Sequence, residues 1–210
     1  MKRTGFDTMS VYRYPLYIVK HPQDGFQELK VNKKGSLKVA AIIVLLWLFV
    51  ELLYRTVTDF DVNPFLNEDV NLFKVILITV LMYIMVCVSN WCFCTLLEGK
   101  GKIKDICVVV AYSLVPYIVM RFIWVSLSGV FIGQELMLFD YCIILAKAWC
   151  VIMAFIGLRE MHEYSVAKTL LSFVLTILGI LIIMFLGMMF FMIIQQVYVF
   201  GQTVMYELLY

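Results

Sequence analysis

The sequence predicts an all-α, polytopic membrane protein with five transmembrane helices, its N-terminus in the cytoplasm and its C-terminus outside the cell. Two observations support this fold class. Of the 210 residues, 63% are hydrophobic and only 15% are charged, a more apolar balance than soluble domains show. The basic residues also lie near the ends of long apolar runs, which is typical of membrane proteins. We therefore expect contact with lipid and no nucleic-acid partner.

Five apolar segments are long enough to cross a bilayer, which takes ~20 residues. We expect spans at about 37–54, 72–97, 106–128, 136–158 and 170–194. They form a transmembrane domain over 37–200, with a basic cytosolic arm over 1–36 and an extracellular tail over 201–210. The fifth apolar run continues past its expected span, and Gln195 and Gln196 indicate where it meets water.

The distribution of Lys and Arg predicts the orientation. The arm is rich in both, and the loop after the second span carries Lys100, Lys102 and Lys104. The loop after the first span is acidic, whereas the loop after the third span and the tail contain no Lys or Arg. Because cationic loops are retained in the cytoplasm, this alternation predicts a cytoplasmic N-terminus and an external C-terminus.

The arm contains one candidate helix. Pro22 suits the first turn of a helix, because its missing N–H would have no partner there. We expect a short interfacial helix with Phe26 and Leu29 facing lipid and Lys30 near anionic headgroups.

Four charged residues lie within the expected spans and away from their first turns. Lys147 lies near the middle of the fourth span, where a Lys costs ~2.5 kcal/mol or more unless it is paired or hydrated. Asp140 and Glu51 are candidate partners, and Arg121 lies toward the outer end of the third span. Two interpretations remain open: an ion or substrate path through Lys147, or a structural ion pair with snorkelling side chains.

Two further patterns concern helix shape and packing. Pro116 in the third span removes a backbone donor and predicts a kink. Near the fifth span, small residues recur at steps of three and four, which favours a packing seam within the chain over a dimer face. This stripe consists of Ser165, Thr169, Ser172, Thr176 and Gly179.

The sequence shows no catalytic pattern. It has only two histidines, His21 and His162, and neither lies in a nucleophile–base pair or a metal-ligand set. The six cysteines lie in or beside apolar segments, where reduced packing thiols are expected. We therefore predict that the protein is not an enzyme and holds no metal or cofactor.

Several short motifs follow one another along nearly the whole chain. They are His21-Pro22 with Gly25-Phe26 and Lys30, Asn90-Trp91 with Thr95 and Glu98-Gly99-Lys100-Gly101, Tyr112 to Pro116, Trp149 with Gly157, and His162-Glu163-Tyr164-Ser165 with Lys168-Thr169. In their order and spacing the chain resembles the Yip1 family, especially its short bacterial members. The resemblance implies the same five-span topology and a place in the bacterial cytoplasmic membrane.

Most of these motifs fall on the expected cytosolic side, where they predict a docking surface for a partner protein. The same residues also suit turns and lipid anchoring, so both interpretations remain open. The candidate partner-binding residues are His21, Pro22, Gly25, Phe26, Asn90, Trp91, Glu98, Gly99, Gly101, His162 and Tyr164.

The resemblance implies a function in broad terms. Eukaryotic relatives bind Rab-type GTPases, but the chain lacks their long N-terminal cytosolic region, which makes GTPase binding doubtful. Some bacterial members accompany carbohydrate transporters of the ATP-binding-cassette (ABC) class, which implies an accessory or scaffold subunit bound to another integral membrane protein, such as a permease of this class. The alternative hypothesis is a small transporter or channel with a polar path at Lys147.

Overall fold

The computed structural model describes residues 13–32, 35–57, 71–128 and 134–209. These described residues form helices and contain no β-strand. The helices are α1 (Tyr14–Lys20), α2 (Pro22–Asn32), α3 (Leu37–Val57), α4 (Leu72–Leu96), α5 (Ile103–Ser113), α6 (Val115–Leu127), α7 (Gln134–His162) and α8 (Val166–Leu209).

Five helical stretches are long and apolar enough to cross a membrane, which confirms the predicted fold class. They are Leu37–Thr56, Leu72–Leu96, Ile103–Leu127, Leu138–His162 and Val166–Leu209. The third consists of α5 and α6 together. The orientation of the two termini stays a prediction.

The third stretch is interrupted at Leu114, between α5 and α6. Pro116 occupies the first turn of α6, where its lack of an N–H leaves no helical bond unmade. The Leu114 N–H instead donates to the Ala111 carbonyl at 3.1 Å, a tighter turn than an α-helical one. The structure therefore places a junction two residues before Pro116.

Helices α1 and α2 pack against the other helices. Phe26 and Leu29 are buried in the main apolar core, so the expectation that they face lipid is wrong. Gly157 of α7 explains the difference, because a Cβ there would lie 3.0 Å from the Phe26 ring and 2.5 Å from a Val109 methyl group. The missing side chain leaves room for the Phe26 ring, which exchanges lipid contact for contact with protein.

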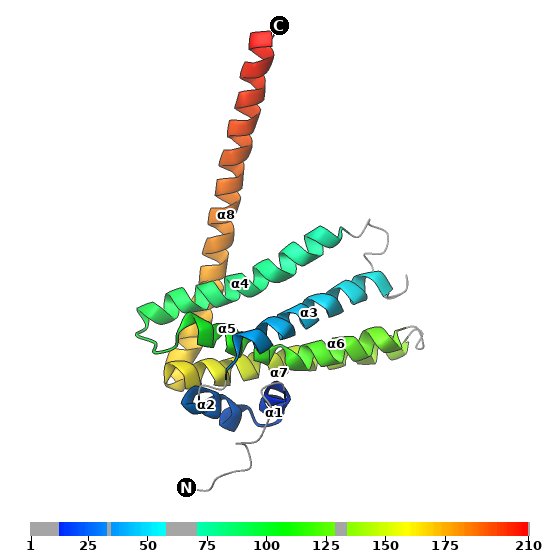
Figure 1. Cartoon of the computed structure of the whole chain (residues 1–210), viewed down its shortest axis with the longest axis vertical. Coiled ribbons are helices and arrows are strands. Elements are labelled where there is room, and N and C mark those ends of the chain that lie inside the picture. The colour runs from blue at the N-terminus through cyan, green and yellow to red at the C-terminus, as the bar shows by residue number, and fades with distance from the viewer. Residues whose placement is uncertain (1–12, 33–34, 58–70, 129–133, 210) are drawn as a thin grey trace.

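The last helix, α8, differs from the other long helices in direction. Figure 1 shows that it crosses α4 and then extends away from the rest of the molecule. Its small residues Thr169, Ser172, Thr176 and Gly179 are buried, whereas every side chain over 184–209 is exposed. The segment over 201–209, expected to be an extracellular tail, continues this helix.

Contacts between α4 and the first half of α8 are polar as well as close. Ser89 Oγ donates a hydrogen bond to the Thr176 carbonyl at 2.7 Å, and Asn90 Nδ2 donates to Thr176 Oγ1 at 3.0 Å. A Cβ at Gly179 would clash with Ser89 Oγ and the Phe93 ring. The small residues from Thr169 to Gly179 therefore pack within the chain, as their spacing predicts, whereas Ser165, the first member of the stripe, is exposed.

Candidate functional site

Two helix ends meet where α4 turns into α5 and α7 turns into α8, and we call this region the loop end. Each helix ends with a glutamate in the left-handed region, Glu98 at φ 59° and Glu163 at φ 58°. The following N–H closes each turn: Gly99 N donates to the Cys94 carbonyl at 2.8 Å, and Tyr164 N to the Arg159 carbonyl at 3.2 Å. These are the bonds of Schellman turns, in which glycine is the usual left-handed residue.

The two turns interlock through a buried histidine. The His162 ring stacks on the Tyr164 ring, with centroids 5.1 Å apart, and His162 Nδ1 accepts a hydrogen bond from the Gly101 N–H at 3.3 Å. A Cβ at Gly99 would clash with His162 Nδ1 and lie 2.5 Å from the Tyr164 hydroxyl. The glycine motif therefore permits close approach of the two turns.

Tyr164 completes the interlock. Its hydroxyl donates to the Cys94 carbonyl at 3.0 Å, inside the turn that ends α4. Burial raises the pKa of Tyr164 above its usual value, so the phenol keeps the proton that this bond requires.

Glu163 connects the loop end to α2. Its carboxylate accepts from Lys30 Nζ at 2.6 Å and also pairs with Lys100 Nζ. The hydrogen bonds and positive charges of Lys100 and Lys30 lower the pKa of Glu163 to about 2. Lys30 Nζ also donates to the Glu160 carbonyl at 2.9 Å, which fixes α2 on the end of α7.

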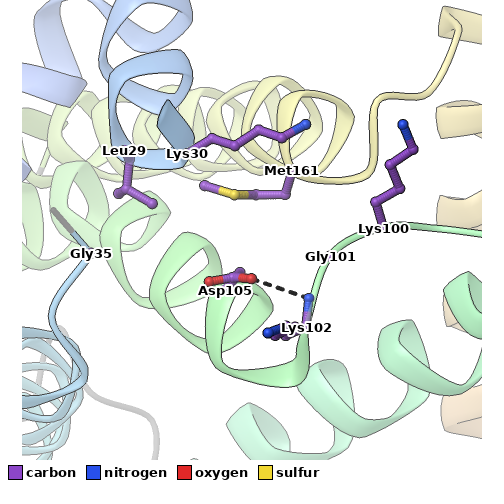
Figure 2. Close-up of a pocket in the computed structure, with 8 residues that line it drawn as sticks. All are labelled: Leu29, Lys30, Gly35, Lys100, Gly101, Lys102, Asp105 and Met161. Atoms are coloured by element: carbon purple, nitrogen blue, oxygen red, sulfur yellow. Dashed lines mark hydrogen bonds between the residues drawn. The ribbon is translucent and has the colours of Figure 1, made fainter. Parts of the chain in front are cut away.

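A cavity of about 280 Å³ is lined in part by Lys30 and Lys100, the two lysines that pair with Glu163 (Figure 2). It is lined by Leu29, Lys30, Gly35, Lys100, Gly101, Lys102, Asp105 and Met161. Asp105 Oδ2 accepts a hydrogen bond from the Lys102 N–H at 3.1 Å, which caps α5. The cavity thus combines a basic rim with apolar side chains from α2 and α7.

The predicted partner-binding residues divide by exposure. Gly25, Phe26, Asn90, His162 and Tyr164 are buried, and they hold helices and turns together. His21, Trp91 and Glu98 are exposed, whereas Pro22, Gly99 and Gly101 are partly exposed. Whether the exposed members bind a partner stays a prediction.

The intramembrane polar residues form two groups. Tyr117 donates a hydrogen bond to Glu51, and Lys147 Nζ lies 5.7 Å from the centre of the Tyr117 ring. Arg121 lies over the Tyr54 ring, 3.4 Å from its centre. Lys147 thus has an aromatic neighbour, and both Lys147 and Asp140 are exposed on α7.

Some residues of the site were not selected from sequence. The predicted partner-binding residues do not include Lys30, Lys100, Lys102, Asp105 or Glu163, although Lys30, Lys100 and Glu163 belong to the family motifs. Two sequence signals indicated the lysines, namely the arm helix that contains Lys30 and the basic loop that contains Lys100 and Lys102, whereas no pattern singled out Asp105. Among the residues that the structure describes, no group of three or more His, Cys, Asp or Glu could hold a metal ion.

The fold and the loop end together define a multi-pass α-helical membrane protein with interlocked helix turns at one end. A model of the Yip1 domain matches residues 16–200, most of the chain. The chain therefore belongs to the Yip1 family, as the order of its motifs predicts. No curated protein and no solved structure matches it.

Proposed function

We propose that this chain is an accessory or scaffold subunit that binds another integral membrane protein through the outer half of α8, residues 184–209. The supporting observation is that α8 continues far beyond its contacts with α4. Its 44 residues correspond to about 66 Å of helix, roughly twice the ~30 Å hydrocarbon core of a bilayer. The first half suffices for packing within the chain, which leaves the outer half available.

The chemistry of the outer half supports a protein partner. Met192, Gln195, Gln196, Val199, Phe200 and Thr203 line one surface groove along it. Most of these positions recur at steps of three and four, so they share a helix face. The sequence predicts that the fifth span meets water at Gln195 and Gln196, and at that boundary their amides can bond to polar groups of a neighbouring helix. A transmembrane helix of another protein fits this face better than lipid alone.

The proposed identity of the partner and of the membrane rests on the family resemblance. Short bacterial members suggest a permease of a carbohydrate ABC transporter as the partner and the bacterial cytoplasmic membrane as the location. With a cytoplasmic N-terminus, the loop end lies on the cytosolic side, where its exposed residues provide a second contact with the same partner.

Site-specific photo-crosslinking tests the proposal. A photoreactive residue replaces Gln196 in a tagged chain that is expressed together with a candidate permease. The matched control position is Ile177, which is also exposed on α8 but lies in its packed half. We expect a crosslink from position 196 to a transmembrane helix of the permease and none from position 177.

Two results would contradict this proposal. Equal crosslinking from both positions would indicate random collision in the membrane. A crosslink at position 196 to a second copy of the chain would assign the outer half to self-association. The double variant Gln195→Leu, Gln196→Leu should reduce co-purification of the permease several-fold, because it removes both amides and keeps the helix.

A further inference from the structure

The cavity at the loop end has the size and composition of a small ligand site. Its volume of about 280 Å³ lies near the lower limit for ligand pockets. Figure 2 shows Met161 between Lys30 and Asp105, with Lys102 next to Asp105 and Lys100 on the far side of Gly101. Leu29 and Met161 supply apolar surface, whereas the lysines supply charge.

The charges around the cavity are nearly balanced, with a positive excess. Lys30, Lys100 and Lys102 face the carboxylates of Asp105 and Glu163, so one positive charge is left over. Glu163 forms ion pairs with Lys30 and Lys100. Asp105 accepts a hydrogen bond from the backbone N–H of Lys102, not from its side chain. Within the described part of the chain, the Lys102 ammonium has no hydrogen bond or ion pair. A single negative charge complements this arrangement.

The surroundings of the cavity indicate the source of that charge. Val31 is exposed beside Lys30, and Ile103 is exposed between Lys102 and Lys104. Leu37, at the start of α3, is exposed beside Lys38. Exposed apolar side chains next to lysines are typical of a surface at the boundary between headgroups and acyl chains.

We propose that this cavity binds the phosphodiester headgroup of an anionic phospholipid. The phosphate carries one negative charge and lies near Lys102, with Lys30 and Lys100 on the rim. The acyl chains extend past the exposed Val31 and Ile103, while Leu29 and Met161 stay buried in the wall of the cavity. This site is independent of the proposed partner-binding face, because it lies at the loop end, where α8 begins, whereas the outer half forms the other end of that helix (Figure 1).

Lipid titration of the purified full-length chain tests the site. Native mass spectrometry in mild detergent compares phosphatidylglycerol, phosphatidylcholine and glycerophosphoglycerol, the soluble headgroup without acyl chains. We expect phosphatidylglycerol to bind most tightly. Lys102→Gln should weaken it about five-fold, as expected for one lysine near an anionic surface. Lys102→Arg should retain binding.

Lys104→Gln is the matched control, because Lys104 is exposed in the same segment but does not line the cavity. We expect it to leave the affinity nearly unchanged. Equal losses in Lys102→Gln and Lys104→Gln would overturn the proposal in favour of diffuse surface attraction. Equal binding of the two phospholipids would also overturn it. If glycerophosphoglycerol competes as well as the lipid, the site takes a soluble phosphate compound and the lipid assignment is wrong.

Unfolding temperatures without added lipid should agree between the two variants, because neither side chain makes a hydrogen bond or ion pair in the described structure.

Discussion

Both halves of α8 are apolar, but their surroundings differ. In the first half, Thr169, Ser172, Thr176 and Gly179 are buried against α4, with hydrogen bonds from Ser89 and Asn90. In the outer half every side chain is exposed. A Cβ added to either glycine there, at position 187 or 201, would meet nothing within 4 Å.

This difference shows that apolar character alone does not determine where a membrane helix packs within its own chain. Large apolar side chains are as stable in contact with lipid as in contact with protein. Burying them therefore contributes little to the association of two helices in a membrane. Small residues let two backbones approach, and hydroxyl and amide groups then bond across the gap. The packed half of α8 has both features on one face.

The largest expected effect on the free energy of unfolding comes from adding a methyl group at Gly179, in the packed half of α8. Gly179→Ala should destabilise the fold by about 1–3 kcal/mol, because its Cβ meets Ser89 and Phe93 in a tightly packed seam. Gly187→Ala is the matched control and should be neutral or stabilising by up to ~1 kcal/mol, since alanine favours helix. Unfolding in mixed detergent micelles, followed by circular dichroism, measures both. Equal effects would mean that the two halves do not differ in packing.

A smaller effect is expected from removing hydrogen bonds in the seam. Asn90→Leu removes the amide that bonds to Ser172 and Thr176, and it should cost about 1 kcal/mol. Gln202→Leu in the outer half removes only an exposed bond to Tyr198 and should change the free energy of unfolding by less than ~0.5 kcal/mol. The same unfolding assay compares them. A larger loss from the outer substitution would contradict the comparison.

The loop end adds a dependence of stability on pH. The pKa of Glu163 is lowered to about 2, so its ion pairs stabilise the fold above the unfolded value near 4.5 and are lost as the pH falls toward 2. We expect wild type and Glu163→Gln to differ in unfolding temperature at pH 7 and to converge below pH 3. Added salt should shrink the difference at pH 7, because the carboxylate is exposed. A constant difference across this pH range would exclude the ion pairs as its source.

The smallest effect is expected from shortening α8. Removing residues 202–209 deletes helix that packs against no other described part of the chain. The unfolding temperature should stay within error of wild type, while binding of a partner to the outer half should weaken. A clear drop in unfolding temperature for the isolated protein would show that these residues support the fold.

Several features of the fold follow from sequence in simple physical terms. Hydrocarbon-length apolar runs predict the five spans, and the steps between Thr169, Ser172 and Thr176 predict a packing face. Both signals are local, because they depend on helix length and helix periodicity alone.

The remaining features depend on residues distant in sequence. Lys30 and Glu163 pair across 133 positions, and neither has a sequence signal that names the other. Phe26 faces protein because Gly157, on another helix, leaves space for its ring. Lys147 lies near Tyr117, not in an ion pair with Asp140, because α6 and α7 pack side by side. The direction of α8 likewise depends on how two turns fit together.

The interlocked turn at Glu163 has a mechanical consequence. It is the point from which α8 starts, and Lys30, Lys100 and Tyr164 fasten it to α2 and α4. Because the seam with α4 holds the first half of α8, only the outer half projects as a rigid arm of about 39 Å, and a rotation of about 10° at the seam moves its far tip by roughly 7 Å. A change at the Glu163 turn would therefore move this tip only if the α4–α8 seam shifted with it.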